Sequence, residues 1–240
     1  MNIVTVNFNT PELIDALVDN VSMYGTHRIT VVDNSTVKPC NDSDKYERID
    51  NTNLEFDDYV TPGRQLCREY GITCYGGSYV HAHTVQKLYD IETEPFLLMD
   101  SDFILKCDPE KIVNYDTLFS GECSNDRVMP MCLFINVPKC KANGVRFFDG
   151  TSICPFSNHD TGYTLFNDCV GHPITQFALR EVGYHLGAAS YTFDGKPNYE
   201  TMLGETTKGH TTKASHLAFI YACRACIPNW LNIINQYRGT

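Results

Sequence analysis

The first 35 residues alternate between two kinds of hydrophobic pattern. Residues 2–9 alternate apolar and polar positions and predict a strand. Thr10 and Pro11 follow, a residue able to cap a helix and one suited to its first turn. Apolar positions three and four apart over 13–21 predict an amphipathic helix. The segment 28–35 predicts a second, buried strand that ends in Asp-Asn-Ser. Strand, helix and strand in this order predict a βαβ unit with parallel strands.

The pattern continues less regularly along the rest of the chain. Residues 36–77 are polar, with a short strand predicted near 46–49. Ser78 is a candidate cap for a helix over 79–89, and a buried strand follows from residue 96. Alternating strands and helices predict an α/β fold with a mostly parallel central sheet, whose ligands gather at the carboxyl ends of the strands. In the second half we expect a strand over 127–137 and helices over 161–170, 173–182 and 215–237.

Composition narrows the class of protein. The 240 residues, 42% of them hydrophobic, suit one domain with a sizeable core. A net charge of −10 argues against a nucleic-acid partner and against simple electrostatic docking to anionic lipid. The sequence shows no secretory signal and no run long enough to span a bilayer, so we expect a cytoplasmic protein. A peripheral membrane contact through residues 228–237 stays open.

The eleven cysteines are best interpreted as reduced and mostly buried. Cys223 and Cys226 have the spacing of a redox or zinc pair. They have no second pair at zinc-site spacing, and they fall in an apolar helical pattern. A structural role is therefore favoured for this pair.

Two carboxylates interrupt an apolar run in the stretch Glu-Pro-Phe-Leu-Leu-Met-Asp-Ser-Asp-Phe-Ile-Leu, residues 94–105. Asp100 and Asp102 must there be neutralised, hydrogen-bonded or bound to a cation. Mg²⁺ or Mn²⁺ would do this and would bridge to substrate phosphates. Capping of the following turn is the alternative. The same Asp-Ser-Asp triplet at residues 42–44 lies in a polar loop, where we expect only a solvated turn.

These segments carry a resemblance to a known family. The two strands with their Thr-Pro helix, the segment Ser-Tyr-Val-His-Ala-His from residue 78 and the Asp100–Asp102 strand end resemble the N-terminal half of GT-A fold glycosyltransferases. They are most similar to the large, mostly inverting family 2. The resemblance covers residues 1–105, and His-Asp-Thr-Gly and Tyr-His-Leu-Gly-Ala-Ala-Ser extend it to about residue 190. It implies one GT-A sandwich domain over 1–240: a nucleotide-sugar half (1–105), an acceptor and catalytic half (106–205) and a C-terminal helical extension (206–240).

The resemblance also implies site residues. Asp100 and Asp102 would bind the metal and the sugar nucleotide, and His185 would complete the metal site, with His210 and His216 as rivals. The nucleotide would contact the ends of the first strands, namely Val6, Asn7, Phe8 and Asp33, together with Asp100. The candidates for the diphosphate are Arg64, His81 and His83. For Asp33 a turn or cap, and for each histidine a purely structural role, are the alternatives.

A general base is implied at Asp160, where an inverting transfer needs a carboxylate within reach of the acceptor hydroxyl. The family pair is Glu-Asp, whereas this chain has His159-Asp160, and Asp168 is the runner-up. Without a base, a retaining mechanism is the alternative.

The expected function is therefore a metal-dependent glycosyltransferase, of hexosyltransferase type. It would move a sugar from a nucleoside diphosphate, UDP ahead of GDP, to a glycan or other hydroxyl acceptor. A nucleotidyltransferase is disfavoured, because residues 6–13 lack a glycine-rich loop for a triphosphate. A nucleotide- or carbohydrate-binding module without turnover is the alternative outside catalysis. Donor sugar, acceptor and oligomeric state stay open.

Overall fold

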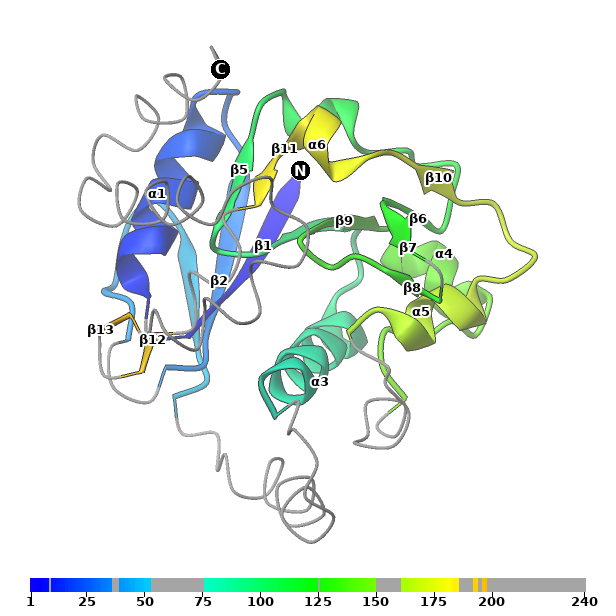
Figure 1. Ribbon diagram of the computed structural model, residues 1–240, viewed down its shortest axis with the longest axis horizontal. Coiled ribbons are helices and arrows are strands. Elements are labelled where there is room, and N and C mark those ends of the chain that lie inside the picture. Colours follow the sequence, from blue (N-terminus) through cyan, green and yellow to red (C-terminus); the bar gives the residue numbers. More distant parts are fainter. Residues whose placement is uncertain are drawn as a thin grey trace, which may run out of the picture.

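The computed structural model describes residues 1–8, 10–35, 39–52, 76–124, 126–149 and 161–185, and two short strands at 192–193 and 196–197. A seven-stranded sheet in the order β10-β6-β9-β4-β1-β2-β3 forms the centre of this part (Figure 1). The pairs within β3-β2-β1-β4 are parallel, β9 is antiparallel to both β4 and β6, and β10 is parallel to β6. Its strands are β1 (Asn2–Asn7), β2 (Arg28–Asp33), β3 (Glu47–Asp50), β4 (Phe96–Met99), β6 (Phe119–Gly121), β9 (Cys132–Ile135) and β10 (Thr175–Gln176).

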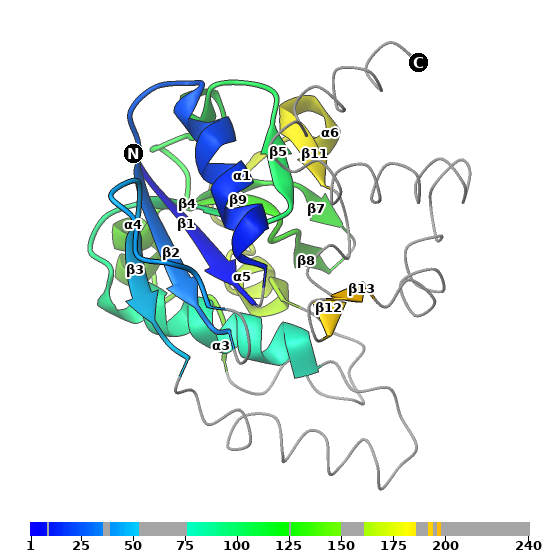
Figure 2. The same cartoon turned by 90° about the vertical axis from the view of Figure 1, so that its left-hand side faces the viewer.

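Helices cover both faces of this sheet (Figure 2). Successive side chains of a strand point to opposite faces. Ile3 of β1 packs in one core cluster with α1 (Pro11–Ser22), whereas the neighbouring Val4 packs in another with α3 (Gly76–Ile91). The short helices α4 (Val137–Ala142) and α5 (Tyr163–Asp168) join the α3 side through Val137, Cys140 and Leu165. The layers are therefore helix, sheet and helix.

Smaller elements complete the described part. β5 (Phe103–Leu105) pairs antiparallel with β11 (Gly183–His185), which directly follows α6 (Leu179–Val182). Two further hairpin-like pairs are β7 (Cys123–Ser124) with β8 (Arg127–Val128), and β12 (Thr192–Phe193) with β13 (Lys196–Pro197). A single 3₁₀ turn spans Pro109–Lys111. The β5–β11 pair matters most for the site, because it brings the second half of the chain to the end of β4.

The predicted α/β fold with a mostly parallel sheet is confirmed, and so are the βαβ unit, Pro11 as the first residue of α1 and the strand at 47–50. The strand predicted over 127–137 is instead split into β8 and β9. Pro130 lies between them, and proline has no N–H to donate to a sheet. The prediction of Ser78 as a helix cap is wrong, because α3 begins at Gly76 and already includes Ser78.

The helix predicted over 173–182 is also wrong in its first half. There the chain bonds to β6 rather than to itself: Leu118 N donates to Pro173 O at 2.9 Å, and Thr175–Gln176 pair with Ser120–Gly121. Only α6 remains helical. The terminal helix over 215–237, including Cys223 and Cys226, lies outside the described residues. Six cysteines within them, including Cys40 and Cys140, are free thiols, as expected.

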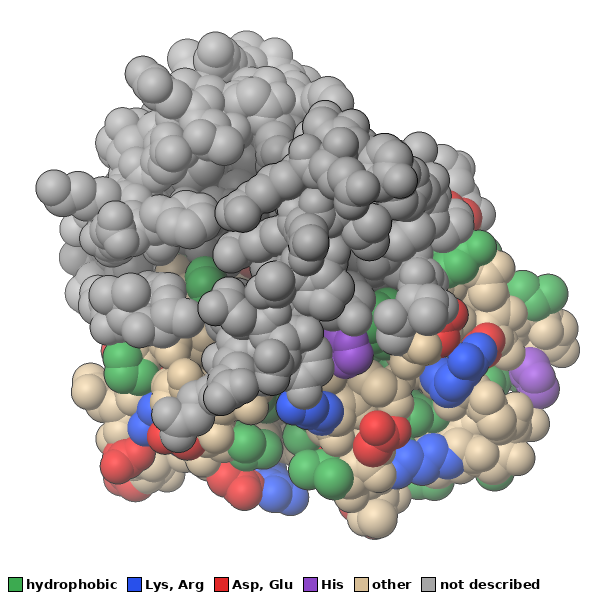
Figure 3. Space-filling view, turned by 90° about the horizontal axis from the view of Figure 1, so that it is seen from below, with side chains coloured by type: hydrophobic (Ala, Val, Ile, Leu, Met, Phe, Trp, Pro, Cys, Tyr) green, Lys and Arg blue, Asp and Glu red, His purple; other side chains and the backbone are tan. Residues whose placement is uncertain are grey.

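Among the described residues, no helix is both long enough and apolar enough to cross a membrane. On the described part of the face in Figure 3, acidic and basic side chains are interspersed rather than gathered by sign.

Candidate metal and nucleotide site

The Asp-Ser-Asp triplet forms a tight turn between β4 and β5. β4 is completely buried between β1 and β9, so the chain leaves the core at Asp100. Asp100 N donates to Met131 O, and Phe103 N donates back to Asp100 O, each at 3.0 Å. This turn leaves the Asp100 side chain 26% exposed and Asp102 only 3% exposed. Two carboxylates thus lie together at the carboxyl end of a central strand.

His185 reaches the same place from the other half of the chain. It ends β11 and is paired with Phe103, the residue after Asp102. Its Nε2 atom lies 3.1 Å from Asp102 Oδ1 and 3.5 Å from Asp100 Oδ2. One ligand atom from each of the three residues lies within 4.8 Å of the others. The structure therefore brings together the three residues predicted to hold the metal.

The charges of this cluster fit a divalent cation. Burial would lower the pKa of His185, but Asp102 and Asp100 outweigh burial and raise that pKa to about 11. The two carboxylates thus favour a positive charge beside them, from a protonated imidazole or from an ion that displaces its proton. Carboxylate oxygens with one imidazole suit Mn²⁺, and carboxylates also suit Mg²⁺.

Of the two histidines proposed on α3 for the diphosphate, His81 lies at the cluster. Its Nε2 atom is 3.8 Å from Asp100 Oδ1, whereas His185 approaches Asp100 Oδ2. His83 instead packs edge-on against Phe148, with ring centroids 4.9 Å apart. Burial lowers the pKa of His83, and Lys87 adds to this effect.

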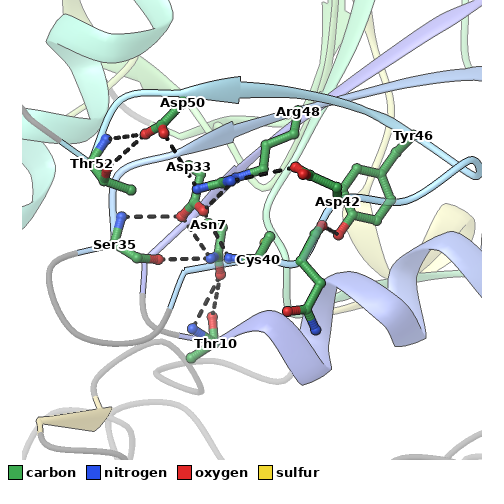
Figure 4. A network of polar contacts seen from close by, with 11 residues as sticks. Asn7, Thr10, Asp33, Ser35, Cys40, Asp42, Tyr46, Arg48, Asp50 and Thr52 are labelled. Carbon is green, nitrogen blue, oxygen red and sulfur yellow. Dashed lines mark hydrogen bonds and ion pairs between the residues drawn. The ribbon is translucent and has the colours of Figure 1, made fainter.

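A polar network joins the ends of β1, β2 and β3 (Figure 4). Asn7 Nδ2 donates to Asp33 Oδ1 at 3.0 Å and to Ser35 Oγ at 2.8 Å. The completely buried Asp33 accepts at Oδ2 from Cys40 N at 2.8 Å and from Arg48 Nε at 3.0 Å. In this structure both Asp33 oxygens thus bond within the protein, and its contact with the nucleotide base remains a prediction.

Arg48 was not found from the sequence. It lies on β3 with a side chain only 19% exposed, and its other nitrogens lie 3.6 Å from Asp42 Oδ1 and 3.8 Å from Asp50 Oδ2. An arginine inside a short predicted strand, near a buried aspartate of the preceding strand, was the available signal. Val6 packs against the core from the end of β1, and Phe8 is half-buried just beyond it.

Some of the remaining predicted residues are described by the structure and others are not. Asp168, the runner-up base, is held by Arg146, whose Nε and Nη2 donate to its two oxygens at 3.0 and 3.1 Å. In the triplet expected to be solvated, Asp42 is 96% exposed. Asp160, Arg64, His210 and His216 lie outside the described residues.

The chain is similar in structure to solved glycosyltransferases. No family model and no curated protein sequence matches the chain. Two solved structures of LgtC are similar: a galactosyltransferase complex with donor and acceptor sugar analogs (TM-score 0.49, 10% identity) and an active-site mutant (TM-score 0.50, 11%). Each match covers 75% of this chain and 74% of LgtC. The glycosyltransferase GlyE of Streptococcus pneumoniae TIGR4 matches with a TM-score of 0.45 at 12% identity, over 87% of this chain and 50% of GlyE.

The chain has the GT-A glycosyltransferase fold. The LgtC mutant structure supports the mixed, mostly parallel sheet predicted from the sequence. Sequence identity this low shows the fold alone, and the comparisons do not support family 2 in particular.

Proposed function

We propose that this protein is a metal-dependent glycosyltransferase that uses a nucleoside-diphosphate sugar. One observation carries the proposal: Asp100, Asp102 and His185 converge at the carboxyl end of β4 in a GT-A fold. Ligands of open α/β sheets bind at that edge. Domain boundaries follow the sequence prediction: a single domain over 1–240, with a nucleotide-sugar half (1–105), an acceptor and catalytic half (106–205) that also supplies His185, and a C-terminal helical extension (206–240).

Each member of the cluster has a definite task in this proposal. Asp100 and Asp102 would hold Mn²⁺ or Mg²⁺ together with His185, once His185 has lost its proton. The bound ion would neutralise the charge that develops on the departing nucleoside diphosphate. His81, whose Nε2 atom lies 3.8 Å from Asp100 Oδ1, would donate a hydrogen bond to a phosphate oxygen.

A retaining transfer is favoured over the inverting one. LgtC, with which the chain shares its fold, is a retaining enzyme. Asp168 is engaged with Arg146, so it is a poor candidate for a general base. Inversion with Asp160 as base is the second hypothesis. A UDP-sugar donor, transfer of a hexose and a glycan or other hydroxyl acceptor complete the proposal.

A thermal-shift panel tests the donor site. UDP, GDP, CDP and the corresponding diphospho-sugars would each be added with and without Mn²⁺. A ligand that binds only the folded state stabilises it and so raises the melting temperature. At a ligand concentration a hundred times its Kd, the apparent free energy of unfolding increases by about 2.7 kcal/mol. We expect a shift with one nucleoside diphosphate that depends on Mn²⁺ and disappears in Asp102→Asn. No shift with any of these ligands would contradict the proposal.

Transfer is then tested with the donor that binds. Release of free nucleoside diphosphate in the presence of candidate acceptors distinguishes an enzyme from a binding module. Binding without any release, over a broad acceptor panel, would favour the module.

A further inference from the structure

The three-residue strand β5 forms backbone hydrogen bonds along both of its edges. On one edge it pairs with β11, and next to this pair Lys106 N donates to Val182 O at 2.9 Å. Backbone groups of successive residues point to alternate edges of a strand. The N–H and C=O groups of Leu105 therefore face the other edge, where α1 lies (Figure 2). What holds that edge also determines where Asp102, just before β5, is placed.

The side-chain amide of Asn20, on α1, occupies that edge in the manner of a neighbouring strand. Leu105 N donates to Asn20 Oδ1 at 2.8 Å, and Asn20 Nδ2 donates to Leu105 O at 3.2 Å. The Tyr24 hydroxyl donates to the same carbonyl at 3.1 Å. Asn20 is completely buried, on the apolar face of its helix. A buried amide there is costly unless it is hydrogen-bonded, which indicates a specific task.

On the opposite edge of β5, the backbone of β11 lies in close contact with β5 at Gly183. A Cβ atom on Gly183, paired with Leu105, would lie 2.3 Å from the Phe103 ring and 2.4 Å from Ile104 O. Only glycine lets β11 approach β5 so closely. Two residues later, the same strand presents His185 to Asp102. A displacement of β5 would therefore move Asp102 and His185 relative to Asp100, which follows β4.

We infer that Asn20 is a positioning residue for the metal site. Its amide fixes the β5–β11 pair against α1 and so sets where Asp102 and His185 lie relative to Asp100 at the end of β4. The inference rests on the proposed function, because it takes these residues as metal ligands. Asn20 lies on α1, away from the two strands that carry the ligands, and in this proposal it contacts neither the ion nor the substrate.

The test compares Asn20→Leu with Val137→Ala. The leucine keeps much of the side-chain volume and removes both hydrogen bonds to Leu105. Val137→Ala removes buried volume from the other core cluster, so it controls for loss of stability alone. Mn²⁺ affinity, measured by electron paramagnetic resonance of free Mn²⁺, should fall about 10–100-fold in Asn20→Leu, as when a partner that orients a metal ligand is lost. It should be unchanged in Val137→Ala.

Hydrogen exchange in ion-free protein gives a second readout. The amides of residues 183–185 should exchange faster in Asn20→Leu than in Val137→Ala, because β11 loses its fixed partner. Unchanged Mn²⁺ affinity in a folded Asn20→Leu would overturn the inference. If that variant does not fold, Tyr24→Phe decides: a few-fold weaker Mn²⁺ binding supports the inference, and wild-type affinity overturns it.

Asp102→Asn separates a failure of the metal site from a failure of the positioning role of Asn20. If the wild type binds no Mn²⁺, or if Asp102→Asn binds it equally well, the proposed metal site fails. If the wild type alone binds and Asn20→Leu matches it, only the positioning role of Asn20 fails.

Discussion

The imidazole of His185 and the carboxylate of Asp102 lie 3.1 Å apart, Nε2 to Oδ1, at adjoining ends of β11 and β5. They come from the two halves of the chain, and only the pairing of these strands brings them together. Asp102 is almost fully buried, so its charge needs a partner that stays in place. The contact is therefore the point at which the two halves of the site depend on each other.

Asp102→Asn should remove metal binding while the protein stays folded. The amide is nearly the same size but is a weaker ligand for a hard cation, and it carries no charge. We expect Mn²⁺ affinity to fall by more than the roughly 10–100-fold typical of losing a residue that only orients a ligand. Isothermal titration with Mn²⁺ measures this, and far-ultraviolet circular dichroism checks the fold.

The chain supplies a matched control. Asp44 is the third residue of the other Asp-Ser-Asp triplet and is exposed to solvent. Asp44→Asn makes the same chemical change and should leave Mn²⁺ affinity unaltered. Equal losses in both variants would mean that general charge, rather than the site at β4, binds the ion.

Arg48→Ala should destabilise the protein much more than Arg28→Ala. Both arginines bond to a carboxylate across the β2–β3 pair, Arg48 to Asp33 and Arg28 to Glu47. Asp33 is completely buried and would lose one of its charge-neutralising donors, at a cost of about 1–3 kcal/mol. The Arg28–Glu47 pair is more than half exposed, and such pairs contribute about 0–1 kcal/mol.

Urea denaturation of both variants gives these free energies of unfolding. Similar values would show that the Asp33 network, despite its burial, is no more important than a surface pair. Donor binding by Arg48→Ala adds a second result. A loss of nucleotide affinity beyond the loss of stability would mean that the network also shapes the nucleotide site.

Local patterns were enough to predict the part of the site that lies along one strand. The apolar run that stops at Asp100 located both the end of β4 and two of the three metal candidates. His185 came instead from resemblance to a family motif, because no local pattern says that residue 185 pairs with residue 103. The same resemblance pointed to family 2, which the comparisons do not support.

Residues that act across the fold were the ones missed. Arg48 and Asn20 are polar side chains whose partners lie on other elements. A polar residue on an apolar face signals a buried partner but does not identify it. Asp33 was predicted to contact the nucleotide, with a turn or cap as the alternative. The protein supplies donors to both of its oxygens, and the nucleotide contact stays a prediction.

Buried thiols should make the protein less stable at alkaline pH. Burial raises the pKa of Cys40, Cys140 and Cys169 from the ordinary 9.0 to about 12. Below pH 9 both folded and unfolded chains keep these protons, so this contribution to stability is fully present there. As pH rises from 9 towards 12, only the unfolded chain ionises, and stability falls by on the order of 1 kcal/mol per thiol per pH unit.

Free energies of unfolding at pH 7.5, 9 and 10.5 measure the slope. Other groups also titrate in this range, so the decisive quantity is the difference from Cys140→Ala. That variant should start less stable, because it leaves a small cavity, and should lose less stability with rising pH. Identical slopes would mean that the Cys140 thiol ionises equally in both states.

Asp160→Asn tests the stereochemical outcome that we propose. An inverting enzyme depends on its general base, and such a base contributes roughly 10²–10⁴-fold to the rate. A retaining enzyme does not need Asp160 as a base, so we expect the variant to keep most of its kcat. The anomeric configuration of the freshly transferred sugar, followed by proton NMR, should match that of the donor.

Asp168→Asn is the control, because it removes a carboxylate from the same half of the chain and, within the described residues, weakens the pair with Arg146. It should lower stability modestly and leave the configuration of the product unchanged. An inverted product together with a hundredfold loss in Asp160→Asn alone would restore the base to residue 160. An inverted product with both variants active would place the base elsewhere in the second half of the chain.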